Sequence, residues 1–171
     1  MDRDKELETA KKRAMYLLGG KDYSRKELMT KLLKNYSRET CEKAVEQMVE
    51  YGFLDDSRYA QKLARHYIEV KKYGKSRAKS LMIQKGLGSS TADEALEQYS
   101  AEDLADEIVT IIKKKYMDRI FAEGPDARAE VQKVIAALAR RGYRYEQIMS
   151  AMKTVRDMDY SDDCDFSESD W

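Results

Sequence analysis

The sequence contains few of the residues that interrupt regular structure. One proline and eight glycines occur in 171 residues, and most of the glycines fall where a helical pattern ends. A β-rich fold would need many more turn residues, so this scarcity excludes it. No apolar run approaches the roughly 20 residues that a membrane-spanning helix needs, and the charged first residues do not form a signal peptide. We therefore predict a cytoplasmic helical protein with no membrane partner.

Cysteine is also scarce, and the two that occur, Cys41 and Cys164, are far apart in the chain. They do not have the spacing of metal ligands, and a reducing cytosol is the natural compartment for such a chain. Cys41 lies on the apolar face of an expected helix, where we predict a buried thiol.

The residues that would form a catalytic centre are missing. His66 is the only histidine, and without a carboxylate and a nucleophile as partners it has nothing to activate, so we expect it at the surface. No Gly-rich phosphate loop of the Walker type is present. The sequence therefore predicts a protein that is not an enzyme and that uses no cofactor, metal or small-molecule substrate.

Hydrophobic residues make up 42% of the chain, enough to bury a core, and they are organised around the stretch Tyr51–Ala60. An amphipathic helix leads into this stretch. Gly52 is suited to end that helix in a left-handed conformation. Asp55 or Asp56 can then accept hydrogen bonds from the first N–H groups of the next helix. The stretch predicts a helix–turn–helix joint.

The helical spacing recurs along the chain in three rounds of three helices. Capping-box patterns open two of these helices, at Ser24–Glu27 and at Thr91–Glu94. The helices are expected at about 4–18, 24–33, 37–52, 57–72, 76–85, 92–99, 101–122, 126–141 and 145–155. They define three three-helix repeats, 1–53, 54–100 and 101–156, followed by an acidic tail, 157–171. We predict an all-α fold whose repeats stack into an elongated, curved body, with a disordered tail.

The overall charge of zero hides an asymmetry along the chain. Acidic and basic residues are equal in number, 32 each, but seven of the acidic ones and no Lys or Arg lie from Asp157 onward. Residues 1–156 therefore carry seven net positive charges. Such a basic body with an acidic tail suggests a polyanionic partner. The alternative is an ordinary solvated helical surface with a solubilising tail.

Three basic clusters are candidate partner-binding or nucleic-acid-binding sites. Stacked repeats would align them as a basic stripe that follows phosphates or acidic loops of a partner. The alternative is that they are solvated helix ends, where the helix dipole favours cations. The first cluster favours binding, because its cations continue into the start of the next helix, where the dipole disfavours them. The clusters are Lys71, Lys72, Tyr73, Lys75, Arg77, Lys79 and Lys85; Lys113, Lys114, Lys115 and Arg119; and Arg140, Arg141 and Arg144.

Several short motifs, in order, resemble the RecX family of RecA regulators. The strongest is the joint Gly52, Phe53, Leu54, Asp55, Asp56, Ser57, Arg58, Tyr59 and Ala60. It is followed by Lys72-Tyr-Gly74, Ser80-Leu81 and Lys85-Gly86, and preceded by Ser24, Glu27-Leu28 and Lys31-Leu32. The resemblance covers roughly Leu7 to Val155. Two positions depart mildly from the family pattern: Ser80 stands where an acidic residue is usual, and Leu87 stands where Ile is usual.

The resemblance implies a regulator, usually an inhibitor, of the RecA recombinase in recombination, DNA repair and the SOS response. Such proteins lie in the groove of the RecA–DNA filament and suppress strand exchange and ATP hydrolysis without catalysis of their own. The residues alone leave two rivals open. One is a sequence-tolerant DNA-binding protein of helix–turn–helix type, which would bind DNA directly. The other is a helical-repeat adaptor for an unrelated protein.

Overall fold

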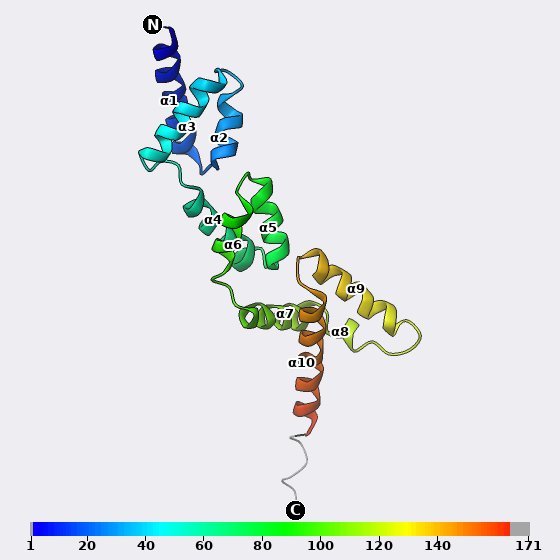
Figure 1. The fold of residues 1–171 in the computed structure, drawn as a ribbon. Helices are drawn as coiled ribbons and strands as arrows, with labels where there is room; N and C mark the ends of the chain where they lie inside the picture. Colours follow the sequence, from blue (N-terminus) through cyan, green and yellow to red (C-terminus); the bar gives the residue numbers. More distant parts are fainter. Residues whose placement is uncertain (1, 165–171) are drawn as a thin grey trace, which may run out of the picture. The chain divides into compact units, whose positions relative to one another are not determined.

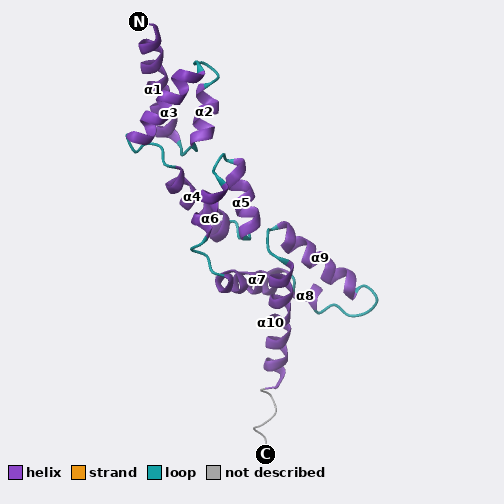
Figure 2. Ribbon diagram, in the orientation of Figure 1, coloured by secondary structure: helices purple, strands orange, loops and turns teal. Residues whose placement is uncertain are grey.

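The computed structural model describes residues 2–164 of the chain, and it describes side chains for residues 2–159. All regular structure in this part is helical, and no strand occurs among residues 2–164 (Figures 1 and 2). The all-α prediction is therefore confirmed. Contacts divide the described chain into two compact units. The first holds residues 2–70 and 78–97, and the second holds residues 71–77 and 98–164.

The first unit contains six helices and one wider, π-helical turn. One core cluster of this unit lies between α1, α2 and α3, where Ala10, Ala14, Leu28, Leu32 and Met48 are fully buried. These residues are spaced as the apolar faces of the sequence predict. The elements are α1 (Asp2–Gly20), α2 (Arg25–Leu32), α3 (Arg38–Glu50), α4 (Asp56–Arg65), the π-helical turn (His66–Val70), most of α5 (Lys75–Gln84) and α6 (Ser89–Leu96).

The predicted start of α2 and end of α3 are confirmed. At the start of α2, the Glu27 N–H donates to Ser24 Oγ over 3.1 Å, and the Ser24 N–H donates to the Glu27 carboxylate over 3.0 Å. This is the expected capping box. At the end of α3, Gly52 takes a φ of 75°, the left-handed conformation that a residue without Cβ adopts at little cost. Cys41 is fully buried and His66 is exposed, both as predicted.

Replacing Gly52 by valine is expected to destabilise the protein by more than about 1 kcal/mol, because a β-branched residue is strained at positive φ. Steric overlap does not contribute, since a Cβ at Gly52 would meet nothing within 4 Å. Gly52→Asn serves as the matched control, because asparagine tolerates this conformation. Thermal unfolding of the two variants measures the difference, and equal midpoints would remove conformational strain as the explanation.

Three details of the first unit differ from the prediction. The helix expected over 57–72 leaves α-helical geometry after Arg65 and continues as the wider turn, in which Ile68 is buried. The capping box at Thr91 is wrong. Helix α6 begins at Ser89, after Gly88, and has no side-chain cap. The helix therefore starts three residues before the expected Ala92, and its buried residues are Ala92, Ala95 and Leu96. Leu33, expected inside, is 37% exposed.

The second unit contains α7 (Ala101–Lys115), α8 (Met117–Ile120), α9 (Ala127–Arg140) and α10 (Tyr145–Cys164). Its buried residues include Leu104, Ile108, Ile111, Ile112 and Ile120 of α7 and α8, Val134 and Leu138 of α9, and Ile148, Met152 and Val155 of α10. All of these were predicted from helical spacing. Met149, also expected inside, is 37% exposed.

The boundaries of two helices in this unit differ from the expected ones. The helix expected over 101–122 is interrupted at Tyr116, whose φ of −131° is not helical, and no glycine or proline marks the break. Helix α10 runs to Cys164, nine residues beyond the expected end at Val155, because nothing in this stretch stops a helix. Residues 165–171 of the acidic tail lie outside the described residues. The division into three repeats stays a prediction.

Candidate partner-binding surface

The structure brings together two of the predicted basic segments, residues 71–77 and residues 140–144, which we call the loop clasp. A backbone hydrogen bond of 2.7 Å joins the Gly74 N–H to the Arg141 carbonyl oxygen. The Tyr143 hydroxyl donates to the Lys72 carbonyl oxygen over 3.0 Å. Both partners in each bond belong to the second unit. The clasp therefore fixes a loop and a helix end that are about 70 residues apart in sequence.

Two of the cations predicted to bind a partner, Arg77 and Arg141, instead form hydrogen bonds within the clasp. Arg77 Nη1 donates to the Arg140 carbonyl oxygen over 2.7 Å. Arg141 Nη1 donates to the carbonyl oxygens of Lys71 and Lys72 over 3.0 and 3.1 Å. Because a guanidinium donates in a fixed, forked geometry, these bonds orient the segments and do not leave the side chains free for a partner.

Glycine makes this close approach possible on both sides. A Cβ on Gly74 would lie 2.2 Å from the Gly142 carbonyl oxygen, and a Cβ on Gly142 would lie 2.5 Å from Arg77 Cβ. Gly142 also has a φ of 92°, and Lys72 is the only described non-glycine residue at positive φ, 58°. Such strained backbone persists only where the surrounding contacts impose it.

Further contacts neutralise or cover the middle of the clasp. Lys72 Nζ lies 3.0 Å from the Glu107 carboxylate. The Arg77 guanidinium lies over the Tyr73 ring, 4.2 Å from its centroid. Burial, together with the nearby charge of Glu107, raises the pKa of Tyr143 to about 12. Tyr143 therefore remains a neutral hydrogen-bond donor at physiological pH.

Four cations at the rim of the clasp remain available to a partner. Lys71, Arg140 and Arg144 are exposed and Lys75 is half-buried, and none of their side chains forms an ion pair or hydrogen bond with the described residues. The clasp thus presents four unneutralised charges from a fixed backbone frame. Such a frame reduces the conformational entropy that a partner must remove on binding.

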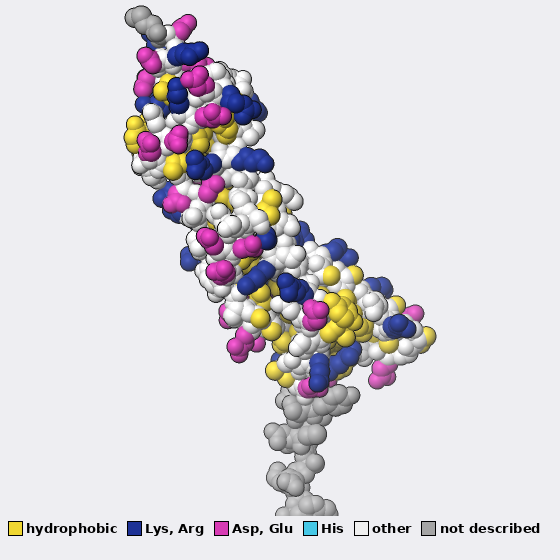
Figure 3. Space-filling view, in the orientation of Figure 1, with side chains coloured by type: hydrophobic (Ala, Val, Ile, Leu, Met, Phe, Trp, Pro, Cys, Tyr) yellow, Lys and Arg dark blue, Asp and Glu magenta, His cyan; other side chains and the backbone are white. Residues whose placement is uncertain are grey.

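The other predicted cations are not brought into the clasp. Lys113, Lys114 and Lys115 are exposed in the last turn of α7, where the helix dipole favours them. Arg119 lies 3.5 Å from Glu130, and Lys79 lies 2.8 Å from Asp93. Figure 3 shows basic and acidic side chains interspersed over the face in view. A single basic stripe therefore stays a prediction.

The family motif at residues 52–60 is mainly a structural joint. Asp55 caps α4 by accepting the Arg58 N–H over 3.0 Å. Asp56 accepts the Arg25 N–H over 2.9 Å and so ties the start of α4 to the start of α2. Burial raises the pKa of Asp56, although this hydrogen bond acts in the opposite direction. Arg58 Nη2 returns to the Gly52 carbonyl oxygen over 3.2 Å.

Some apolar residues of the motif are buried, and others are exposed to solvent. Leu54 and Ala60 are buried, and burial raises the pKa of the half-buried Tyr59 to about 12. Phe53 is 54% exposed and meets the equally exposed Tyr51 edge to face, with 6.3 Å between the ring centroids. Exposed aromatic pairs of this kind are frequent in protein interfaces, so Phe53 extends the list of candidate contact residues.

Sequence reasoning missed a further group of cations. Lys21, Lys26, Lys31 and Lys34 gather with Lys85 around one cavity in the first unit. Of these five, only Lys85 was among the binding cations proposed from the sequence, and Lys31 was named only in the family pattern. The available signal was the density of lysine between residues 21 and 34, but helical spacing alone could not show that the turn after α5 lies beside it.

Neither a metal-binding cluster nor a membrane-spanning helix occurs in the described part of the chain. No group of three or more His, Cys, Asp or Glu side chains among residues 2–159 is arranged to hold a metal ion. None of the helices within residues 2–164 combines the length and the apolar character that crossing a bilayer requires.

Comparison with known proteins gives one consistent match. The family model for the first three-helix domain of RecX matches residues 10–48, and that for the second three-helix domain matches residues 55–96. The regulatory protein RecX of Vibrio cholerae is 31% identical over 86% of this chain and 94% of its own length. That of Clostridioides difficile is 28% identical over 90% of this chain and 71% of its own length.

Solved structures agree on the fold. The crystal structure of RecX from Lactobacillus salivarius superposes with a TM-score of 0.80 and covers 90% of this chain and 98% of its own, at 18% identity. At that identity the likeness supports the all-helical fold alone. The level of identity to the Vibrio protein, over nearly its whole length, supports the family. This chain belongs to the RecX family of regulatory proteins.

Proposed function

We propose that this chain regulates the RecA recombinase, as an inhibitor that lies in the groove of the RecA–DNA filament in the cytoplasm. Membership of the RecX family carries this proposal, since the relatives are named regulatory proteins. Inhibition then comes from occupying the groove, and it limits recombination and DNA repair. No catalytic step by this chain is needed.

The loop clasp supports the choice of a polyanionic partner. Lys71, Lys75, Arg140 and Arg144 project from a frame held by hydrogen bonds between backbone and side chains. A filament that contains DNA offers phosphates and acidic loops at short range, and positive charge steers association with such surfaces. In this proposal Lys113, Lys114 and Lys115 add long-range attraction, and Arg77 and Arg141 position the clasp.

An ATPase assay tests the proposal directly. Added to RecA on single-stranded DNA, the chain is expected to suppress ATP hydrolysis in a concentration-dependent way. The triple variant Lys71→Glu, Lys75→Glu, Arg144→Glu should raise the half-inhibitory concentration by roughly tenfold or more, because like charges would then face the polyanion. The matched control is Lys12→Glu, Arg128→Glu, Lys153→Glu, which makes the same charge change at exposed positions elsewhere.

Each rival predicts a different result. Unchanged ATPase activity at saturating protein would contradict the proposal and favour an adaptor for another protein. A DNA-binding protein of helix–turn–helix type would bind naked DNA tightly. With about six phosphate contacts it would lose roughly a thousandfold in affinity between 50 and 200 mM salt. A filament-groove regulator should bind naked DNA weakly and the filament strongly.

A further inference from the structure

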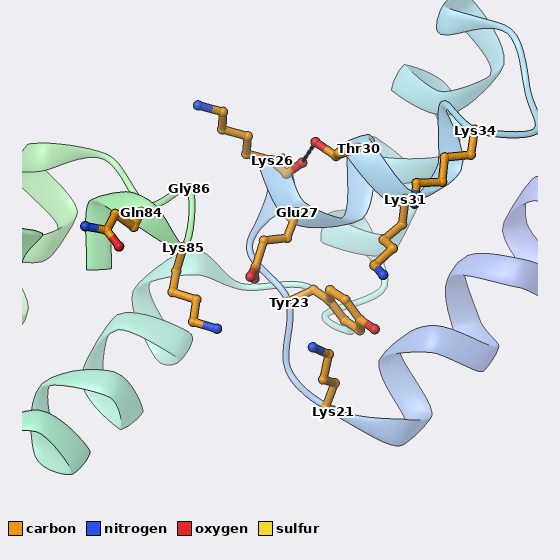
Figure 4. Close-up of a pocket in the computed structure, with 10 residues that line it drawn as sticks. All are labelled: Lys21, Tyr23, Lys26, Glu27, Thr30, Lys31, Lys34, Gln84, Lys85 and Gly86. Atoms are coloured by element: carbon orange, nitrogen blue, oxygen red, sulfur yellow. Dashed lines mark hydrogen bonds between the residues drawn. The ribbon is translucent and has the colours of Figure 1, made fainter. Parts of the chain in front are cut away.

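The lysine pocket of the first unit is a cavity of about 340 Å³ between the start of α2 and the turn after α5. Five lysines line it: Lys21, Lys26, Lys31, Lys34 and Lys85. Figure 4 shows the amino groups of Lys21, Lys31 and Lys85 pointing toward the Tyr23 ring, while Lys26 points away from it. The Lys21 amino group lies over that ring, 4.6 Å from its centroid.

The charges of this pocket are not neutralised within the described residues. None of the five amino groups forms an ion pair with a described residue, whereas six other lysines within residues 2–159 do. The single acidic residue of the lining, Glu27, is directed to the Ser24 N–H of its own capping box. Asp22 is next to Lys21 in sequence but pairs with Lys62 over 2.8 Å. Four net positive charges therefore surround the cavity.

The wall of the pocket is fixed by contacts between segments far apart in sequence. The buried Ser24 hydroxyl donates to the Lys85 carbonyl oxygen over 2.5 Å. Gly86, at a φ of 89°, packs so closely that a Cβ would lie 2.7 Å from Ser24 Oγ and 2.8 Å from Lys26 Cβ. The lysine stems thus start from backbone that cannot shift freely. A preformed site of this kind gains affinity because little ordering remains to be done on binding.

The position of Lys26 adds to the positive potential at this end of α2. It lies in the first turn of α2, where the helix dipole disfavours a cation. Three N–H groups at this helix start, those of Ser24, Arg25 and Glu27, are already bonded and do not face an anion as free donors. The lysine amino groups are therefore the principal donors of the pocket. Lysine ammonium groups bind phosphate as point charges.

We infer that the lysine pocket binds consecutive phosphate groups of a single nucleic-acid strand. The cavity and its charge exceed what one phosphate requires, and a strand supplies several in a row. This inference does not rest on the proposed regulation of RecA, because the pocket acts on the strand directly. It adds a second, separate phosphate-binding site to the chain, in the first unit, whereas the loop clasp belongs to the second unit.

Binding of a fluorescent 15-residue oligothymidylate, followed by anisotropy over a salt series without RecA, tests the inference. The variant Lys21→Gln, Lys31→Gln, Lys85→Gln is expected to lose roughly tenfold or more in affinity at low salt. The slope of log K against log salt should fall by about 2, the value for three lost contacts on a single strand. The control Lys5→Gln, Lys12→Gln, Lys153→Gln removes the same charge from exposed positions and should keep the wild-type slope.

Further arms of the experiment identify the ligand. Displacement of the oligonucleotide by inorganic tripolyphosphate from the wild type, but not from the pocket variant, supports phosphate recognition. Tripolyphosphate binding without measurable oligonucleotide binding would overturn the assignment to a nucleic-acid strand. Equal competition by oligoglutamate would overturn it in favour of an acidic peptide. An unchanged slope in the pocket variant would overturn the site itself, and RecA inhibition could still hold.

Discussion

Replacing Gly74 by alanine should open the loop clasp and lower the free energy of unfolding by about 3 kcal/mol. The added Cβ would lie 2.2 Å from the Gly142 carbonyl oxygen and 2.7 Å from the Tyr143 nitrogen. These are backbone atoms, so no flexible side chain can move aside. Overpacking of this kind costs about 1–3 kcal/mol. Separation of the segments would also weaken the hydrogen bond to Arg141, worth about 1 kcal/mol.

Thermal unfolding measures this effect, with a midpoint lowered by roughly 6–12 °C for a chain of this size. Gly19→Ala is the control, because a Cβ there would meet nothing within 4 Å and the residue lies in exposed helix α1. Alanine in such a position is expected to stabilise the protein by about 0.5–1 kcal/mol. If both substitutions shifted the midpoint in the same direction, the close approach at Gly74 would not be a determinant of stability.

Replacing Ser24 by alanine is expected to cost about 2–4 kcal/mol, more than a helix cap alone. The hydroxyl is fully buried, accepts the Glu27 N–H and donates to the Lys85 carbonyl oxygen. Alanine would leave both of these partners without a bond in a site from which water is excluded. The same change would loosen the turn that carries Lys85, so oligonucleotide binding to the lysine pocket should weaken together with stability.

Ser100→Ala isolates the contribution of the cap. Ser100 and Asp103 form the same capping box at the start of α7, but Ser100 is exposed and its hydroxyl bonds only to Asp103 among the described residues. We expect a cost of about 1 kcal/mol there. Denaturant unfolding of both variants gives the two values. Equal losses would mean that the Ser24–Lys85 bond contributes nothing beyond the cap.

Most helices of this fold could be predicted, because their apolar residues follow one strong period. The buried faces of α3, α7 and α9 repeat every three or four residues, and burial of such a face decides helix formation. The errors occur where a local signal competes with packing. Thr91 resembles a cap, yet α6 already begins at Ser89, after Gly88, without any side-chain cap. The break at Tyr116 carries no glycine or proline, so composition could not reveal it.

The candidate site was less predictable, because charge in a sequence does not say what the charge contacts. Arg77 and Arg141 were grouped with Lys71 as partner-binding cations, but both donate to carbonyl oxygens more than 60 residues away. The lysine pocket was missed for the opposite reason, because cations that are far apart in the sequence lie together in the structure. Its residues come from positions 21–34 and from Lys85, and contacts such as the Ser24–Lys85 bond and the packing of Gly86 make them neighbours.

The path of the chain has a practical consequence for dissecting this protein. Residues 71–77 belong to the second unit, although residues before and after them belong to the first. A truncated fragment that stops after residue 97 would retain both segments matched by the family models. It would also discard the carbonyl of Arg141 and the hydroxyl of Tyr143. Its connection between the π-helical turn and α5 would then be solvated and open to proteases, so fragments should be cut elsewhere.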